Sequence, residues 1–410
     1  MHKLDFEILF FFAMLALMSF LLCVSCNHSI KKTEVEGCVV MEIDIIENLH
    51  KNQKISLSAV ASNIEYCLLE TDKKCLVANK NMYCTREHVV TIGDQCYVFD
   101  RNTGSFVRQI SSKGQGPDEY TDYINFWDNK NEQICLLGNN QFYFFNLDGT
   151  LSHKANRFKH SLHSFVQHND FYVRYVTNSL GNSKSRIEFY NKSGILVDSI
   201  PNYRSWERTK SSYGSSTDSW LYIFHDNLYY KDLYCDTLYH INNFMLQPRY
   251  IFNTGGQAVP YEIQEGGAYE VSASLSSGVL VVDRYEKYMR ISEMFEDNNN
   301  LYFTIRYKKY LYPAIYVKKE NNLQIMPPIS MPPITRYSKI PLYGFENDLD
   351  GGLPFWPTQM ISEKEMMCVY TAEELLELDS SKITDEKLKN VLNNLEEDSN
   401  PVVVIVTLKD

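Results

Sequence analysis

The chain has 410 residues, of which 44% are hydrophobic, and its formal net charge at pH 7 is −11. This length allows two or three ordinary domains or one large repeat domain with a sizeable core. The acidic balance argues against a nucleic-acid partner, because phosphate binding needs a basic face.

The N-terminal segment indicates a targeting signal. Its apolar run, Ile8–Leu22, has 15 residues and is short for a membrane span. Val24-Ser25-Cys26 follows and resembles the lipobox of bacterial lipoproteins, which implies a signal peptide over residues 1–26 and lipidation at Cys26. An uncleaved anchor and plain secretion are the alternatives. The absence of acids in Asn27–Lys32 favours the periplasmic side of the outer membrane, so we expect a cell-envelope lipoprotein held by its lipid.

The cysteines beyond the signal show irregular spacing, with neither a CxxC pair nor a Cys/His zinc pattern. Five of them lie within apolar, strand-like runs and are expected to be buried as small hydrophobic residues: Cys67, Cys84, Cys96, Cys135 and Cys368. An oxidising compartment leaves a Cys75–Cys84 disulfide open.

A repeating hairpin organises the chain after a tether at 27–54, which contains an early strand, Val39–Ile45. Each early hairpin joins two apolar runs through a turn rich in Asn, Asp and Gly. The turn glycines are spaced 45 residues apart, at Gly104, Gly149 and Gly194. With other apolar runs beside each hairpin, the unit has about four strands. A fixed period of this length is typical of a propeller.

The repeat continues with looser spacing. A fourth hairpin is expected at Thr237–Ile241 and Pro248–Phe252, and a fifth at Ala314–Val317 and Leu323–Met326. Residues 254–290 do not fit the unit and are interpreted as an insertion between two blades. The sequence therefore predicts an all-β fold, a six-bladed β-propeller of four-stranded blades over residues 55–410.

The last unit is split by a small α-helical insert at 371–400. Thr371 and Glu374 form a capping box at its start. The insert carries nine acidic residues and three lysines, which we interpret as a solvated helix face, with a partner-binding tail as the alternative. The flanking runs, Met366–Tyr370 and Val402–Leu408, are predicted to pair. Ile64–Leu69 should join them in one blade and close the ring.

Four segments together resemble the six-bladed β-propeller lipoproteins of Gram-negative bacteria, a largely uncharacterised family related in architecture to NHL-repeat propellers. The segments are Gly114–Tyr120, Asp236–Tyr239 with Pro248–Tyr250, Asn347–Pro357 and Asn400–Lys409. One departure is Asp118, where the family tends to have Gly. The resemblance implies a fold and an envelope location, and it supplies no established reaction.

The candidates for a binding site lie near Gly351-Gly352. Asp348 and Asp350 flank this turn, and they could bind a cation or cap the turn through their own side chains. Tyr343 and Trp356, with the adjacent Phe355, form either an aromatic platform for a sugar or packing between blades 5 and 6.

The other sequence motifs give little indication of a cofactor or metal site. Gly114-x-Gly116 matches half of a dinucleotide fingerprint but is followed by Pro117 and no helix, so no cofactor is predicted. No metal site is predicted either, although a structural or catalytic divalent cation is left open. Four histidines lie close in sequence and are interpreted as surface or strand-end residues: His153, His160, His163 and His168.

Two classes of function remain. The first is a membrane-anchored binding or scaffolding module for a glycan, peptide or partner protein at the mouth of the channel. The alternative is a metal-dependent hydrolase or lyase with its site in the central channel. The enzyme requires Asp, Glu, Asn or His side chains from at least three blades to converge on the axis, which the sequence does not reveal.

Overall fold

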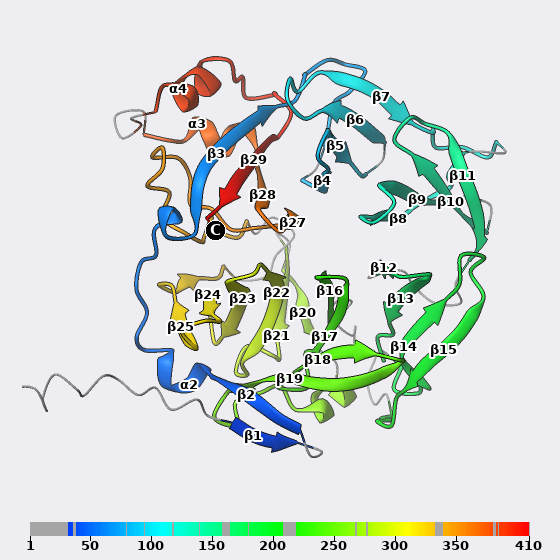
Figure 1. Ribbon diagram of the computed structural model, residues 1–410, viewed down its shortest axis with the longest axis vertical. Coiled ribbons are helices and arrows are strands. Elements are labelled where there is room, and N and C mark those ends of the chain that lie inside the picture. Colours follow the sequence, from blue (N-terminus) through cyan, green and yellow to red (C-terminus); the bar gives the residue numbers. More distant parts are fainter. Residues whose placement is uncertain are drawn as a thin grey trace, which may run out of the picture.

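The computed structural model describes residues 32–409 except 36–37, 79, 94, 117–118, 139, 158–164, 179, 208–218, 267–268, 276–277, 333–338, 380–382 and 384. Six sheets, antiparallel except for one pair of strands at the edge of blade 4, stand in a ring around a central axis, each blade with its first strand innermost (Figure 1). The predicted six-bladed β-propeller is confirmed.

Blades 1 to 3 each consist of four strands that run outward in chain order. Blade 1 comprises β4 Met82–Cys84, β5 His88–Thr91, β6 Cys96–Asp100 and β7 Phe106–Ile110. Blade 2 comprises β8 Asp122–Asp128, β9 Gln133–Leu137, β10 Gln141–Asn146 and β11 Leu151–Asn156. Blade 3 comprises β12 Phe165–His168, β13 Phe171–Tyr175, β14 Ser185–Tyr190 and β15 Leu196–Pro201.

Blade 4 is extended at its outer edge by the N-terminal segment. Its strands are β16 Ser219–Phe224, β17 Asn227–Asp232, β18 Thr237–Asn242 and β19 Met245–Asn253. The predicted early strand is present as β2, Cys38–Asp44, which pairs in parallel with β19 and antiparallel with β1, Lys32–Val35. A short helix, α2 Ile45–Asn48, and a 3₁₀ turn, η1 Leu57–Ala59, lead on to blade 6.

Blade 5 follows a segment that joins no blade. This segment contains the 3₁₀ helix η2, Tyr261–Gly266, and a separate hairpin of β20 Tyr269–Leu275 and β21 Gly278–Asp283. The blade itself comprises β22 Arg290–Glu296, β23 Asn300–Tyr307, β24 Tyr310–Val317 and β25 Asn322–Ile325, with β26 Ile329–Ser330 beside β24.

Blade 6 closes the ring with strands from both ends of the chain. It comprises β27 Gln359–Ser362, β28 Glu365–Tyr370, β29 Val402–Leu408 and, outermost, β3 Ala61–Leu68. The register places Val404 of β29 between Cys368 and Tyr66. This is the predicted closure, in which the terminal strand has a partner on both edges.

Strand burial follows position in the blade. All residues of β9 are buried, whereas the outermost β15 is exposed at four of six positions. Middle strands face a neighbouring blade on both sides and therefore have continuous apolar sequences. Buried apolar clusters fill all six interfaces between consecutive blades, so the core is a ring of six parts rather than one centre.

The turn glycines explain the 45-residue period. Gly104 has φ +71°, and a Cβ built there would lie 1.7 Å from the carbonyl oxygen of Leu68 in the preceding blade. Gly194 has φ +75°, and its Cβ would lie 2.3 Å from the carbonyl oxygen of Asn156. Each of these turns therefore rests against the outermost strand of the blade before it, with no room for a side chain.

The insert in blade 6 contains α3, Ala372–Leu376, and α4, Glu386–Asn393. The predicted capping box of Thr371 and Glu374 is present. Leu375 is fully buried in the cluster between blades 5 and 6, and Leu388 of α4 packs in a cluster with Tyr66 of β3. The insert therefore covers the outermost strand of the closing blade as well as linking two strands.

The five cysteines expected to be buried are buried. Cys75 and Cys84 are both free thiols, so the disulfide that the sequence left open is not formed. Cys75 instead donates to the carbonyl oxygen of Glu70 at 3.3 Å. Burial raises the pKa of Cys84 to about 12, which keeps this thiol protonated and unreactive.

Candidate binding site

A polar cavity of about 100 Å³ lies between blades 3 and 4. It sits where β13, β15 and β17 end and where β14 and β16 begin, and the segment between blades 4 and 5 adds two residues to its wall. Its lining is Val176, Asn178, Arg186, Pro201, Asn202, Tyr203, Arg204, Ser219, Tyr230, Asp232, Tyr234, Tyr261 and Gln264.

An ion pair forms one wall of the cavity. The guanidinium of Arg186 in β14 is bonded to the carboxylate of Asp232 in β17, and its Nε donates to the Tyr230 hydroxyl at 3.1 Å. Burial alone would lower the pKa of Arg186, but Tyr230 and Asp232 raise it. Burial and the charge of Asp232 raise the pKa of Tyr230. Arg186 is thus a fixed cation and Tyr230 a neutral hydroxyl.

Another part of the wall is held by Asn178, which is 5% exposed. Its amide nitrogen donates to the carbonyl oxygen of Arg204 at 3.1 Å and to the hydroxyl of Tyr261 at 2.6 Å. The Arg204 guanidinium carbon lies 4.9 Å from the centre of the Tyr261 ring. These contacts connect the β15–β16 segment, which carries Arg204, to the segment after blade 4, which carries Tyr261.

Two lining residues carry groups that the fold does not use, a hydrogen-bond donor on Gln264 and an exposed aromatic ring on Tyr203. The amide nitrogen of Gln264 is buried, and no group in the described part of the chain accepts a hydrogen bond from it. A buried donor without a partner costs about 1–3 kcal/mol, so its retention needs a reason. Tyr203 is 91% exposed at the rim. An unpaired donor and an exposed aromatic ring among the residues of one cavity wall are an arrangement suited to a ligand.

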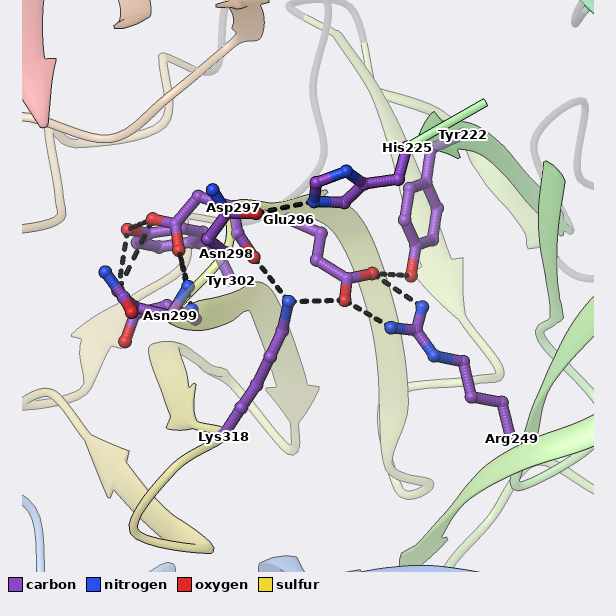
Figure 2. A network of polar contacts seen from close by, with 10 residues as sticks. Tyr222, His225, Arg249, Glu296, Asp297, Asn298, Asn299, Tyr302 and Lys318 are labelled. Carbon is purple, nitrogen blue, oxygen red and sulfur yellow. Dashed lines mark hydrogen bonds and ion pairs between the residues drawn. The ribbon is translucent and has the colours of Figure 1, made fainter. Parts of the chain in front are cut away.

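A second polar assembly lies at the other end of β16, between blades 4 and 5 (Figure 2). Glu296 has no exposed side-chain surface and accepts from three groups: Arg249 at 2.5 and 2.7 Å, Lys318 at 2.7 Å and the Tyr222 hydroxyl at 2.8 Å. Burial alone would lower the pKa of Arg249, but Glu296 raises it. Both oxygens of Glu296 are occupied, so this carboxylate ties the two blades together.

His225 brings three blades into contact at this end. It lies in the β16–β17 turn, with Nε2 2.5 Å from Oδ1 of Asn298 in blade 5 and Nδ1 3.3 Å from Oε1 of Glu363 in blade 6. This is a convergence of the kind that an enzyme would need. The described ranges contain no group of three or more His, Cys, Asp or Glu residues arranged to hold a metal ion.

The candidate acids of the sequence lie in the segment between blades 5 and 6. Asp348 is exposed and accepts from the backbone nitrogen of Ser58 at 2.9 Å. Asp350 is 1% exposed and accepts from the backbone nitrogen of Gly352 at 2.8 Å, as a turn cap does. Neither lies in the cavity between blades 3 and 4.

The candidate aromatic residues lie in the same segment. Trp356 is 6% exposed and stacks on Phe345, with ring centres 6.0 Å apart, in the cluster between blades 5 and 6. Tyr343 donates to Glu293 at 2.8 Å, and burial followed by the charge of Glu293 raises its pKa. Trp356 is thus packed between blades rather than presented to solvent.

Several predicted features lie outside the described residues: Cys26, Asp118, His160 and His163. The other two histidines do not share a site. His153 contacts the Tyr172 hydroxyl at 3.1 Å, and His168 contacts the backbone oxygen of Asp226 at 2.7 Å. In the portion of the chain that the structure describes, no helix has the length and apolar character needed to cross a membrane.

The family of the chain follows from a match over most of its length. The model of a family described as Domain of unknown function (DUF4934) matches residues 40–407. The chain belongs to this family. No curated protein matches it.

One solved structure supports the fold of this DUF4934 protein. A Bacteroides fragilis protein named "Putative exported protein" is similar over 90% of this chain and 99% of its own, with 17% identity and a TM-score of 0.62. A member of the DUF4221 family from Bacteroides vulgatus covers 85% of this chain and 97% of its own, with 10% identity and a TM-score of 0.49. At this identity, the first likeness shows the propeller fold alone.

The sequence did not single out the cavity residues Arg186, Tyr203, Arg204 and Gln264. One feature of the sequence did indicate part of the cavity wall. The stretch that breaks the repeat, 254–290, is the segment that supplies Tyr261 and Gln264 to the wall. An interruption in an otherwise regular repeat therefore marked the DUF4934 cavity better than the conspicuous Asp and aromatic residues near Gly351.

Proposed function

We propose that this DUF4934 protein is a binding module of the cell envelope and that its ligand enters the cavity between blades 3 and 4. The observation that carries the proposal is a polar cavity whose wall includes Gln264, with a buried amide nitrogen that has no acceptor among the described residues, and the exposed ring of Tyr203. Ligand sites are concave and hold a few converging polar groups that fix orientation. A glycan, a peptide or a partner protein could supply the missing acceptor.

The envelope location in this proposal rests on the N-terminal segment. The run Ile8–Leu22 followed by Val24-Ser25-Cys26 supports lipidation at Cys26 and an outer-membrane anchor with the propeller on the periplasmic side. The Bacteroides fragilis relative carries the word "exported" in its name, which agrees with an envelope location. An anchored propeller would present its cavity at a fixed distance from the membrane.

The second candidate, a metal-dependent hydrolase or lyase, is favoured only by the meeting of His225, Asn298 and Glu363. Both ring nitrogens of His225 already have partners there. If His225 instead held a catalytic metal, His225→Ala would abolish Zn²⁺ or Mn²⁺ binding measured by calorimetry.

The binding function is tested by filling the cavity. Ser219 opens onto it from the start of β16, so Ser219→Trp places an indole in the space of the ligand. We expect the wild type to bind a subset of probes on glycan and peptide arrays and Ser219→Trp to lose that subset. Lys319→Trp, which introduces the same side chain at an exposed residue of the β24–β25 turn, is the control and should keep it. Retained binding by Ser219→Trp would overturn the proposal.

A further inference from the structure

We infer that the cavity between blades 3 and 4 recognises an acidic sugar, with the carboxylate of the sugar inside the cavity and its ring against Tyr203. This inference rests on the proposed binding function and names its ligand class. It is carried by four properties of the cavity: its charge, its unpaired donor, its size and its rim.

The charge of the lining is positive in a chain that is acidic overall. Arg186 and Arg204 carry positive charges, and Asp232 carries the one negative charge among the lining residues. Asp232 is already bonded to Arg186. Within the described ranges, no carboxylate contacts the guanidinium of Arg204, which lies over Tyr261. One cation thus remains for a ligand, and guanidinium groups bind carboxylates through paired N–H donors.

The buried amide nitrogen of Gln264, like the guanidinium of Arg204, is a hydrogen-bond donor. Gln264 lies in the wall with Arg204 and Tyr261, and its buried amide nitrogen has no acceptor among the residues that the structure describes. A carboxylate offers two acceptor oxygens and could accept from both Gln264 and Arg204. A cationic end group such as an ammonium has no acceptor for either donor, and a neutral oxygen could accept from both but would not neutralise the charge of Arg204.

The cavity admits one end group rather than a whole ligand. Its volume of about 100 Å³ is well below the roughly 300–1,000 Å³ that encloses a drug-sized molecule. A carboxylate fits, and the remainder of the molecule must leave through the opening. Tyr203, which is 91% exposed, lies at that opening and offers a flat apolar face.

The rest of the lining favours a sugar over the carboxyl end of a peptide. Ser219 and Tyr230 have hydroxyls 3.2 Å apart, and such groups both donate and accept. Sugar hydroxyls likewise donate and accept, and the C–H face of a sugar ring can lie flat on Tyr203. A peptide end presents fewer hydroxyl groups to match this wall.

The test uses calorimetry on the folded mature chain with four probes: trigalacturonate, the neutral galactotriose, a short peptide with a free C-terminal carboxylate, and inorganic phosphate. We expect saturable binding of trigalacturonate that weakens as salt is raised. Gln264→Leu should weaken it about tenfold or more, and Gln264→Glu further, because a second carboxylate repels the first. Tyr203→Ala should also weaken it.

A charge-matched pair controls for long-range effects. Arg204→Glu should abolish binding of trigalacturonate, whereas Lys319→Glu, the same change of charge at an exposed turn, should leave it within about twofold. Melting temperatures close to wild type for each variant exclude unfolding as the cause.

Each other outcome overturns a defined part. The wild type could bind galactotriose as tightly as trigalacturonate, with no loss of binding in Gln264→Glu. That result would refute recognition of an acidic group, and the proposed binding function would still hold. Binding of the peptide alone would refute the sugar, and binding of phosphate alone would show a bare anion site. If no probe binds but array ligands are lost in Ser219→Trp, the acidic-sugar inference fails while the proposed function holds. If neither is seen, both fail.

Discussion

The hydroxyl of Tyr66 in β3 donates a hydrogen bond of 2.7 Å to Asp350, which lies 284 residues further along the chain. The same carboxylate accepts from Asn347 at 2.7 Å and from the backbone nitrogen of Gly352 at 2.8 Å. Asp350 therefore links the outermost strand of the closing blade to the segment that connects blades 5 and 6. Three donors already occupy a buried carboxylate, which makes it a structural group.

Asp350→Ala should destabilise the fold by about 2–4 kcal/mol, because it leaves buried donors without an acceptor. The matched control is Asp348→Ala, two residues away, where an exposed carboxylate accepts from Ser58. The control should cost less than about 1 kcal/mol. Urea unfolding followed by tryptophan fluorescence measures both. If added Ca²⁺ raised the melting temperature of the wild type but not of Asp350→Ala, this residue would instead be a cation ligand.

The turn glycines allow a graded test of blade spacing. Gly104→Ala combines a left-handed φ with a backbone contact at 1.7 Å, whereas a Cβ at Gly149, with φ +87°, meets its nearest atom at 3.9 Å. We expect Gly149→Ala to cost about 1–2 kcal/mol, the conformational penalty alone. Gly104→Ala should cost clearly more, because the contact between blades 6 and 1 must open. Equal losses in thermal unfolding would contradict this packing.

The repeat could be predicted because it depends on local chemistry. A turn that needs φ above zero selects Gly, and strands buried on both sides select apolar runs, so Gly104, Gly149 and Gly194 marked the hairpins directly. Ring closure was predictable for a similar reason, since Val402–Leu408 is too apolar to lie at an open edge.

The cavity could not be predicted in the same way. Its lining comes from five strand ends, the β15–β16 segment and η2, which are brought together only by the curvature of the ring. Arg186 and Gln264 have no spacing in the sequence that sets them apart from other polar residues. The pairing of β2 with β19 was also not predicted. The two strands are parallel and lie some 200 residues apart in the sequence, so no hairpin turn connects them and marks the pair.

His153 should make stability depend on pH in mild acid. Its ring stacks on Phe144, with ring centres 4.2 Å apart, and burial lowers its pKa below the ordinary value of 6.5. As the pH falls below about 6.5, the unfolded chain takes up a proton that the folded ring does not, so folding stability declines until the lower folded pKa is passed. Above that window the contribution is constant.

The comparison is between wild type and His153→Gln in urea unfolding at pH 7.5 and pH 5. We expect the variant to lose less stability between these two values than the wild type does. His240→Gln should act in the same direction, because burial and the charge of Arg249 lower the pKa of His240. Parallel losses in all three proteins would show that neither ring titrates differently on folding.

Cys26→Ser tests the proposed anchor. If Cys26 is lipidated, the wild type should fractionate with outer membranes and incorporate labelled palmitate. The variant should incorporate no label. Cys23→Ser, three residues earlier, is the matched control and should still be labelled. A Cys26→Ser protein that remains membrane-bound without label would show that the apolar run is itself the anchor.

The closed ring makes the last strand essential. Four residues of β29 have no exposed surface: Val402, Val403, Val404 and Val406. The strand pairs with β28 on one side and with β3 on the other, so its removal separates the two ends of the chain. Each buried Val contributes about 1.5–3 kcal/mol, and four together approach the roughly 5–15 kcal/mol of a whole domain. A chain ending at Ser399 should therefore be insoluble or lack cooperative unfolding, whereas one ending at Leu408 should unfold within a few degrees of the wild type. A soluble Ser399 truncation with an unchanged melting temperature would mean that blade 6 does not hold the ring together.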